Sequence, residues 1–158
     1  YDSKLEEIEY LKQLIKQIPT LGICFGAQLI ASVFGGEIKK QENKEIGFNE
    51  ILILKEHKMF ENIHKELNVF QFHYDHIKNL PENSISLAKS NLCHQAYIFE
   101  NFLGVQFHPE IDLEFAKCEY NAIKNCPINK YCEIEFFKNH NKEHKPELIF
   151  ENFLNYQI

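Results

Sequence analysis

The chain has 158 residues and a formal net charge of −6, and 44% of its residues are hydrophobic, including 14 Phe and 7 Tyr. This composition suits a single folded domain over residues 1–158 and argues against disorder. No basic block is long enough to follow a phosphate backbone, and no apolar run is long enough to cross a bilayer, so we expect neither nucleic acid nor a membrane as a partner.

The pattern of hydrophobic residues predicts alternating helices and strands. We expect helices over residues 3–15, 28–34, 112–124 (with Asp112 as N-cap) and 147–156, one or two helical turns at 57–63, and a short helix around 132–138. Strands are expected over residues 20–24, 37–40, 48–55, 67–72, 84–90, 96–99 and 103–107. The polar cluster at residues 73–76 is expected in a loop. Helices on both sides of mixed strands predict an α/β fold with an open mixed sheet.

The first predicted helix has no strand before it, and the chain starts with Tyr1 and not with Met. A helix in that position should cover a sheet. We therefore expect a single domain that is N-terminally truncated and lacks its first strands. Five cysteines, an odd number without a C-x-x-C pair, favour reduced thiols and a cytoplasmic protein.

Residues 22–28 read Gly-Ile-Cys-Phe-Gly-Ala-Gln, between a predicted buried strand and a predicted helix. This pattern is typical of a nucleophile elbow, which exposes the turn residue Cys24 at the carboxyl edge of a sheet. Gly22 and Gly26 are expected where a side chain would collide with the neighbouring backbone. The amino end of the following helix favours the thiolate, the reactive form of cysteine. The alternative is a buried cysteine in a glycine-rich turn.

A cysteine nucleophile needs a base, and the base needs a group that orients it. The predicted strand 103–107 leads directly into His108, Pro109 and Glu110. In an open α/β sheet this strand end lies at the edge that also carries Cys24. Glu110 can fold back to hold one imidazole nitrogen. The sequence therefore predicts a catalytic set of Cys24, His108 and Glu110.

Residues 22–28 together with 106–110 resemble the triad-type (class I) glutamine amidotransferases. The resemblance covers nearly the whole chain and is greatest to the stand-alone domains related to the amidotransferase part of GMP synthase. Further matching segments are Gly35-Gly36, Glu45-Ile46-Gly47-Phe48, Phe70-Gln71-Phe72-His73-Tyr74-Asp75, Leu80-Pro81 and Asn152-Phe153-Leu154. The fold that this implies is the flavodoxin-like open sheet of the family.

The resemblance implies hydrolysis of L-glutamine through a glutamyl thioester on Cys24, with the ammonia passing to a synthetase partner chain and with no cofactor. His108 would act as general base and then as acid, and Glu110 would orient it. The backbone N–H of Phe25 would be one oxyanion-hole donor. Gln28 would help to hold the substrate, and so would the backbone near His73 and Tyr74. Many members of the family carry glycine at the position of Tyr74.

Two other functions stay open at this stage. One is hydrolysis of other γ-glutamyl amides, which needs the same triad and different pocket contacts. The other is a catalytically impaired fragment or regulatory subunit that binds a synthetase. No metal site is expected, because His73, His76, Cys93 and His94 fit no zinc spacing.

Overall fold

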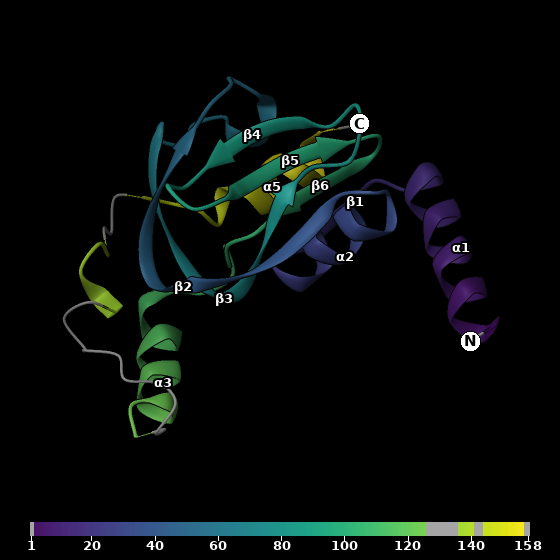
Figure 1. The fold of residues 1–158 in the computed structure, drawn as a ribbon. Helices are drawn as coiled ribbons and strands as arrows, with labels where there is room; N and C mark the ends of the chain where they lie inside the picture. Colours follow the sequence, from purple (N-terminus) through teal and green to yellow (C-terminus); the bar gives the residue numbers. More distant parts are fainter. Residues whose placement is uncertain (1, 126–135, 141–143, 157–158) are drawn as a thin grey trace.

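The computed structural model of the chain describes residues 2–125, 136–140 and 144–156. Within these residues a six-stranded mixed sheet carries helices on both faces (Figure 1). In chain order the elements are α1 (Asp2–Gln17), β1 (Thr20–Ile23), α2 (Phe25–Val33), β2 (Glu37–Ile53), the 3-10 turn η1 (Lys58–Phe60), β3 (Glu66–Asn79), β4 (Ile85–Lys89), β5 (His94–Phe99), β6 (Phe102–Val105), α3 (Leu113–Ile123) and α5 (Leu148–Asn155).

The strand order is β1-β6-β5-β4-β2-β3. Strands β1 and β6 pair in parallel, with Gly22 opposite Gly104, and the other neighbours are antiparallel. Because β1 and β6 run in parallel, their carboxyl ends lie at the same edge of the sheet. The segments that follow these two strands, which begin with Cys24 and Gln106, therefore start next to each other.

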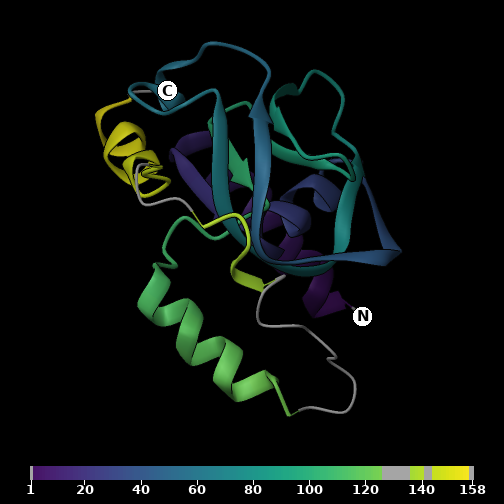
Figure 2. The same cartoon turned by 90° about the vertical axis from the view of Figure 1, so that its left-hand side faces the viewer.

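Two apolar clusters cover the two faces of the sheet. On one face α2 packs through its alanines and Ile30 against Tyr97 and Phe102, and Ile15 of α1 joins this cluster. On the other face Ile149 of α5 packs against residues of β2, β3, β4, β5 and β6. A third cluster joins Ala116 of α3 to Phe48, Phe70 and Phe136. In both views α3 projects away from the curved β2–β3 pair (Figures 1 and 2). The predicted open mixed sheet flanked by helices is confirmed.

The loop expected at residues 73–76 is wrong, because β3 continues through it to Asn79. The reason is the long partner strand β2, which pairs with this segment as far as Asn79. His73 and His76 are buried, while Tyr74 and Asp75 are more exposed. Polar residues therefore extend this strand beyond its apolar half.

The two separate strands expected at 37–40 and 48–55 are also wrong, because they form the single strand β2. Its pairing with β3 shifts register between Lys40 and Glu45, where β2 is irregular. Gly47 lies in the part of β2 where pairing with β3 resumes after this shift, and its φ is +82°. A Cβ there would come within 2.3 Å of the carbonyl oxygen of Phe136, so only glycine fits.

The other predicted elements agree with the structure to within a few residues. Asp112 caps α3, since its side chain accepts a hydrogen bond of 2.8 Å from the N–H of Phe115. Most of the helix expected around 132–138 lies outside the described residues. No helix among the described ranges has the length and apolar character that a membrane span requires.

Candidate active site

Cys24 alone forms the turn between β1 and α2, as the motif predicts. Its φ of 49° and ψ of −107° lie where residues with a side chain are rarely found. Its N–H donates to the carbonyl oxygen of Val105 at 2.8 Å, which fixes the turn to the end of β6. Such a strained backbone typically costs about 1–3 kcal/mol and persists where the surrounding structure holds it. The sharp strand-to-helix turn that the motif predicts at Cys24 is therefore present.

The two glycines of the motif differ in their surroundings. A Cβ on Gly22 would lie 2.4 Å from Phe102 and 3.0 Å from the backbone nitrogen of Ala27. The collision expected for a side chain at Gly22 is therefore confirmed. A Cβ on Gly26 would meet nothing within 4 Å among the described residues. The collision expected at Gly26 is wrong, because this residue lies in the first turn of α2 and faces open space.

His108 follows β6 and pairs with β3, since its N–H donates to the carbonyl oxygen of Phe70 at 2.8 Å. Its Nδ1 lies 2.7 Å from Oε1 of Glu110. A carboxylate can only accept, so Nδ1 carries a proton and donates it to Glu110. The other ring nitrogen, Nε2, is then left to interact with Cys24.

The charges of this group favour a protonated imidazole. Burial alone would lower the pKa of His108, but hydrogen bonds and attraction to Cys24 and Glu110 outweigh it and raise the pKa to about 9. Burial tends to raise the pKa of the Glu110 carboxyl, yet its hydrogen bond to His108 and the imidazolium charge hold the pKa below its ordinary value. The arrangement therefore holds a protonated imidazole of His108 beside the sulfur of Cys24.

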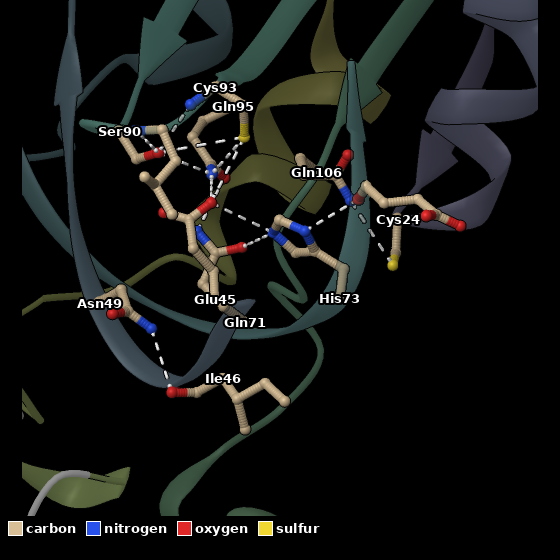
Figure 3. Close-up of polar contacts among 12 residues, drawn as sticks. Cys24, Glu45, Ile46, Asn49, Gln71, His73, Ser90, Cys93, Gln95 and Gln106 are labelled. Carbon is tan, nitrogen blue, oxygen red and sulfur yellow. Dashed lines mark hydrogen bonds and ion pairs between the residues drawn. The ribbon is translucent and has the colours of Figure 1, made fainter. Parts of the chain in front are cut away.

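Gln28 lies on α2 and is 8% exposed, so its side chain is directed into the protein. Its Nε2 donates to the backbone carbonyl oxygen of Asp75 at 2.7 Å and to Oε1 of Gln106 at 3.1 Å. Gln106 in turn donates to the sulfur of Cys24 at 3.7 Å. A chain of amides thus joins the strand that carries His73 to the cysteine (Figure 3).

The remaining predicted site residues are Phe25, His73 and Tyr74. Phe25 is the first residue of α2, and its N–H is among those without an intrahelical partner. Its side chain is 70% exposed. His73 is buried on β3 and reaches Gln28 only through the carbonyl oxygen of Asp75. The ammonium nitrogen of Lys44 lies over the ring of Tyr74, 4.6 Å from its centre.

Sequence reasoning gave no role to Gln106, although it lies within the matched 106–110 motif. Neither did it find the buried polar contacts around His73, which involve Glu45, Gln71 and Gln95. The available signal was a glutamine within or directly beside a short apolar run, at Gln71, Gln95 and Gln106. A buried amide needs hydrogen-bond partners, so such positions point to a polar network inside the fold.

A comparison with protein families finds that residues 2–126 match the glutamine amidotransferase class-I model. A protein from Methanosphaera stadtmanae, named as a glutamine-hydrolysing GMP synthase subunit, is 42% identical over 112 residues, which cover 68% of this chain and 60% of the relative. The protein of the same name from Methanocaldococcus jannaschii is 34% identical over 125 residues, covering 77% and 63%. The chain therefore spans only 60–63% of the length of these relatives.

Solved structures agree with this comparison. A glutamine amidotransferase from Thermotoga maritima has a TM-score of 0.69 at 28% identity, covering 98% of this chain and 63% of that one. A glutamine amido transferase from Methylobacillus flagellatus has a TM-score of 0.77 at 19% identity, covering 95% and 68%. At that lower identity the second likeness concerns the fold alone.

Proposed function

The chain belongs to the class I glutamine amidotransferase family, and we propose that its site hydrolyses the side-chain amide of L-glutamine to glutamate and ammonia. The observation that carries the proposal is the strained elbow at Cys24, beside a histidine whose Nδ1 is held 2.7 Å from Glu110. This is the geometry of a nucleophile with an oriented base.

The proposed reaction has two halves. The thiolate of Cys24 attacks the amide carbon of glutamine, and a tetrahedral intermediate forms. The imidazolium of His108 then donates its Nε2 proton to the leaving nitrogen, so that ammonia departs and a glutamyl thioester remains. In the second half neutral His108 takes a proton from water as the water attacks the thioester. Glutamate leaves and the imidazolium–thiolate pair returns.

Further residues are proposed to stabilise the charged groups of these steps and to hold the substrate. The N–H of Phe25 at the start of α2 is proposed to donate to the oxygen of the tetrahedral intermediate, and one such donor is typically worth about 10²–10³ in rate. The amide of Gln106 donates to the Cys24 sulfur and helps to hold the thiolate. Gln28 and the backbone near His73 and Tyr74 are proposed to line the part of the site that holds the substrate.

We extend the proposal to a partner chain. The curated relatives are each named as one subunit of a glutamine-hydrolysing GMP synthase, and such a name implies a second chain in the assembly. By analogy, the ammonia released at Cys24 would pass to a synthetase partner. The chain resembles the glutaminase part of such an assembly, so we propose that it supplies ammonia and that the acceptor binds to the partner.

The direct test is ammonia release from glutamine by the purified chain and by Cys24→Ala. Loss of the nucleophile should lower turnover by at least about 10³-fold. Cys118→Ala is the matched control, because Cys118 is an exposed thiol on α3 and should leave turnover unchanged. Equal turnover in wild type and Cys24→Ala would contradict the proposal. Turnover of γ-glutamyl amines without turnover of glutamine would overturn the substrate assignment and support the hydrolase alternative.

A further inference from the structure

Behind the site, four buried side chains form a closed ring of polar contacts (Figure 3). His73 Nε2 lies 2.9 Å from Gln71 Oε1, and Gln71 Nε2 lies 2.7 Å from Gln95 Oε1. Gln95 Nε2 lies 2.9 Å from Glu45 Oε2, which is 3.4 Å from His73 Nε2. All four side chains are more than nine-tenths buried. The sulfur of Cys93 joins the ring 3.3 Å from Glu45 Oε2.

The protonation of His73 is fixed by its other nitrogen. Nδ1 lies 3.0 Å from the backbone carbonyl oxygen of Asp75, which can only accept a hydrogen bond. Nδ1 therefore carries a hydrogen. Nε2 faces into the ring, toward the oxygens of Gln71 and Glu45.

In either orientation of its amides, the ring brings two acceptor atoms face to face unless a proton or a cation lies between them. In the orientation with Gln71 Oε1 next to His73, that oxygen faces Nε2. If both amides are reversed, Gln71 donates to His73, but the oxygen of Gln95 then faces the carboxyl group of Glu45 at the 2.9 Å contact. Two buried lone pairs in contact are unfavourable, so a proton or a cation at the centre would stabilise the ring.

The atoms around this point are those that a borderline-soft metal ion prefers. A nitrogen, an oxygen and a sulfur from His73, Glu45 and Cys93 lie within 4.8 Å of one another. Tetrahedral zinc with ordinary bond lengths would place its nitrogen and oxygen ligands about 3.4 Å apart and its sulfur and oxygen ligands about 3.6 Å apart. The corresponding separations here are 3.4 and 3.3 Å. These two separations fit the ion, and the third, between the His73 nitrogen and the Cys93 sulfur, is at most 4.8 Å.

The surroundings of His73 also fit a metal ligand. A histidine that binds a metal commonly donates its other ring N–H to a backbone carbonyl, which fixes the tautomer. Nδ1 of His73 makes this contact with Asp75. One surface hollow is lined by Glu45 and another by Cys93, and the Ser90–Leu92 segment lines both.

We propose that Glu45, His73 and Cys93 form a binding site for one divalent transition-metal ion of the zinc class. Burial raises the pKa of the Cys93 thiol, so the ion must displace a proton from the sulfur as it binds. The three ligands come from β2, β3 and the turn between β4 and β5, which explains why no short zinc spacing marks the site. The Asp75 carbonyl accepts from both His73 and Gln28, so the ion would stiffen the network that reaches Cys24.

Cobalt is the probe for this site, because thiolate-bound Co²⁺ shows a charge-transfer band and a tetrahedral ion absorbs in the visible. The full chain carrying Cys24→Ala is titrated with Co²⁺, since that change removes the cysteine beside His108. We expect one ion per chain with thiolate character, displaced by Zn²⁺. Cys93→Ser in the same background should abolish the charge-transfer band and weaken binding at least about 100-fold, whereas Cys118→Ser should change neither.

A second measurement needs no change at Cys93. Zn²⁺ should slow the alkylation of Cys93, read by peptide mass spectrometry, and leave that of the exposed Cys118 unchanged. This readout holds even if Cys93→Ser fails to fold. The proposal is wrong if Co²⁺ gives no thiolate band in the Cys24→Ala chain, if the band persists after Cys93→Ser, or if Zn²⁺ leaves the alkylation rate of Cys93 unchanged. Any of these results would mean that the ring holds a proton in place of an ion.

Discussion

The backbone conformation of Cys24 predicts that the usual stability order of alanine and glycine variants is reversed at this position. At most helix and strand positions glycine is less stable than alanine by about 0.5–1 kcal/mol. Cys24 has a φ of 49° and a ψ of −107°, a conformation that favours glycine. Replacing Cys24 by Ala removes the thiol but keeps the Cβ and its strain, whereas Cys24→Gly removes both.

The expected difference follows from two opposing terms. Relief of a strained non-glycine conformation is worth about 1–3 kcal/mol. The added freedom of glycine in the unfolded chain costs about 0.5–1 kcal/mol. We therefore expect Cys24→Gly to be more stable than Cys24→Ala by about 1 kcal/mol. Urea unfolding of the two variants, followed by circular dichroism, measures this difference directly.

The matched control is Lys117, an exposed residue within α3. There the usual order should hold, with Lys117→Gly less stable than Lys117→Ala by about 1 kcal/mol. The prediction is wrong if the unfolding free energy of Cys24→Gly is lower than that of Cys24→Ala by the same amount as at the control position. In that case the turn at Cys24 would carry no strain, and the argument for a held elbow would fail.

Three further predictions concern the same region. Gly22→Ala should destabilise the chain by about 1–3 kcal/mol, because the new Cβ would collide with the ring of Phe102. Gly26→Ala should stabilise the chain by up to about 1 kcal/mol, because this position is helical and faces open space. The urea unfolding midpoints of the two variants test this contrast. Tyr97→Phe removes a buried 2.7 Å hydrogen bond to the Ala27 carbonyl oxygen of α2 and should lower the unfolding free energy by about 1 kcal/mol. An unchanged unfolding free energy would contradict this hydrogen bond. The pKa of His108 is raised to about 9, so the stability from its protonated form is complete below its ordinary pKa and is lost as the pH rises toward 9. Glu110→Gln should flatten that fall in unfolding free energy, and an unchanged slope would contradict the pairing.

The local geometry of the motifs around Cys24 and His108 could be predicted from the sequence, because their signals are local. A glycine on each side of a cysteine, between an apolar strand and a helix, predicts the elbow at Cys24. The position of His108 at a strand end places it at the same sheet edge, and the register of β1 with β6 agrees. Asp112 was likewise predictable as a cap, since its role depends on residues within one turn.

Contacts between strands were not predictable in the same way. Residues 73–76 are polar and were expected in a loop, because nothing local shows that β2 supplies partners for their backbone. The ring around His73 depends on side chains that come together from three strands of the sheet. The space around Gly26 likewise depends on the packing of α2 and cannot be inferred from the spacing of the motif.

The central claim is that Cys24 is the nucleophile that attacks glutamine. Its most direct test is intact mass spectrometry of the chain after incubation with an electrophilic glutamine analogue, followed by peptide mapping. We predict one covalent adduct per chain on Cys24, absent from Cys24→Ala, retained in Cys118→Ala, and slowed by excess L-glutamine. An adduct on another cysteine, or labelling that glutamine does not slow, would contradict the assignment.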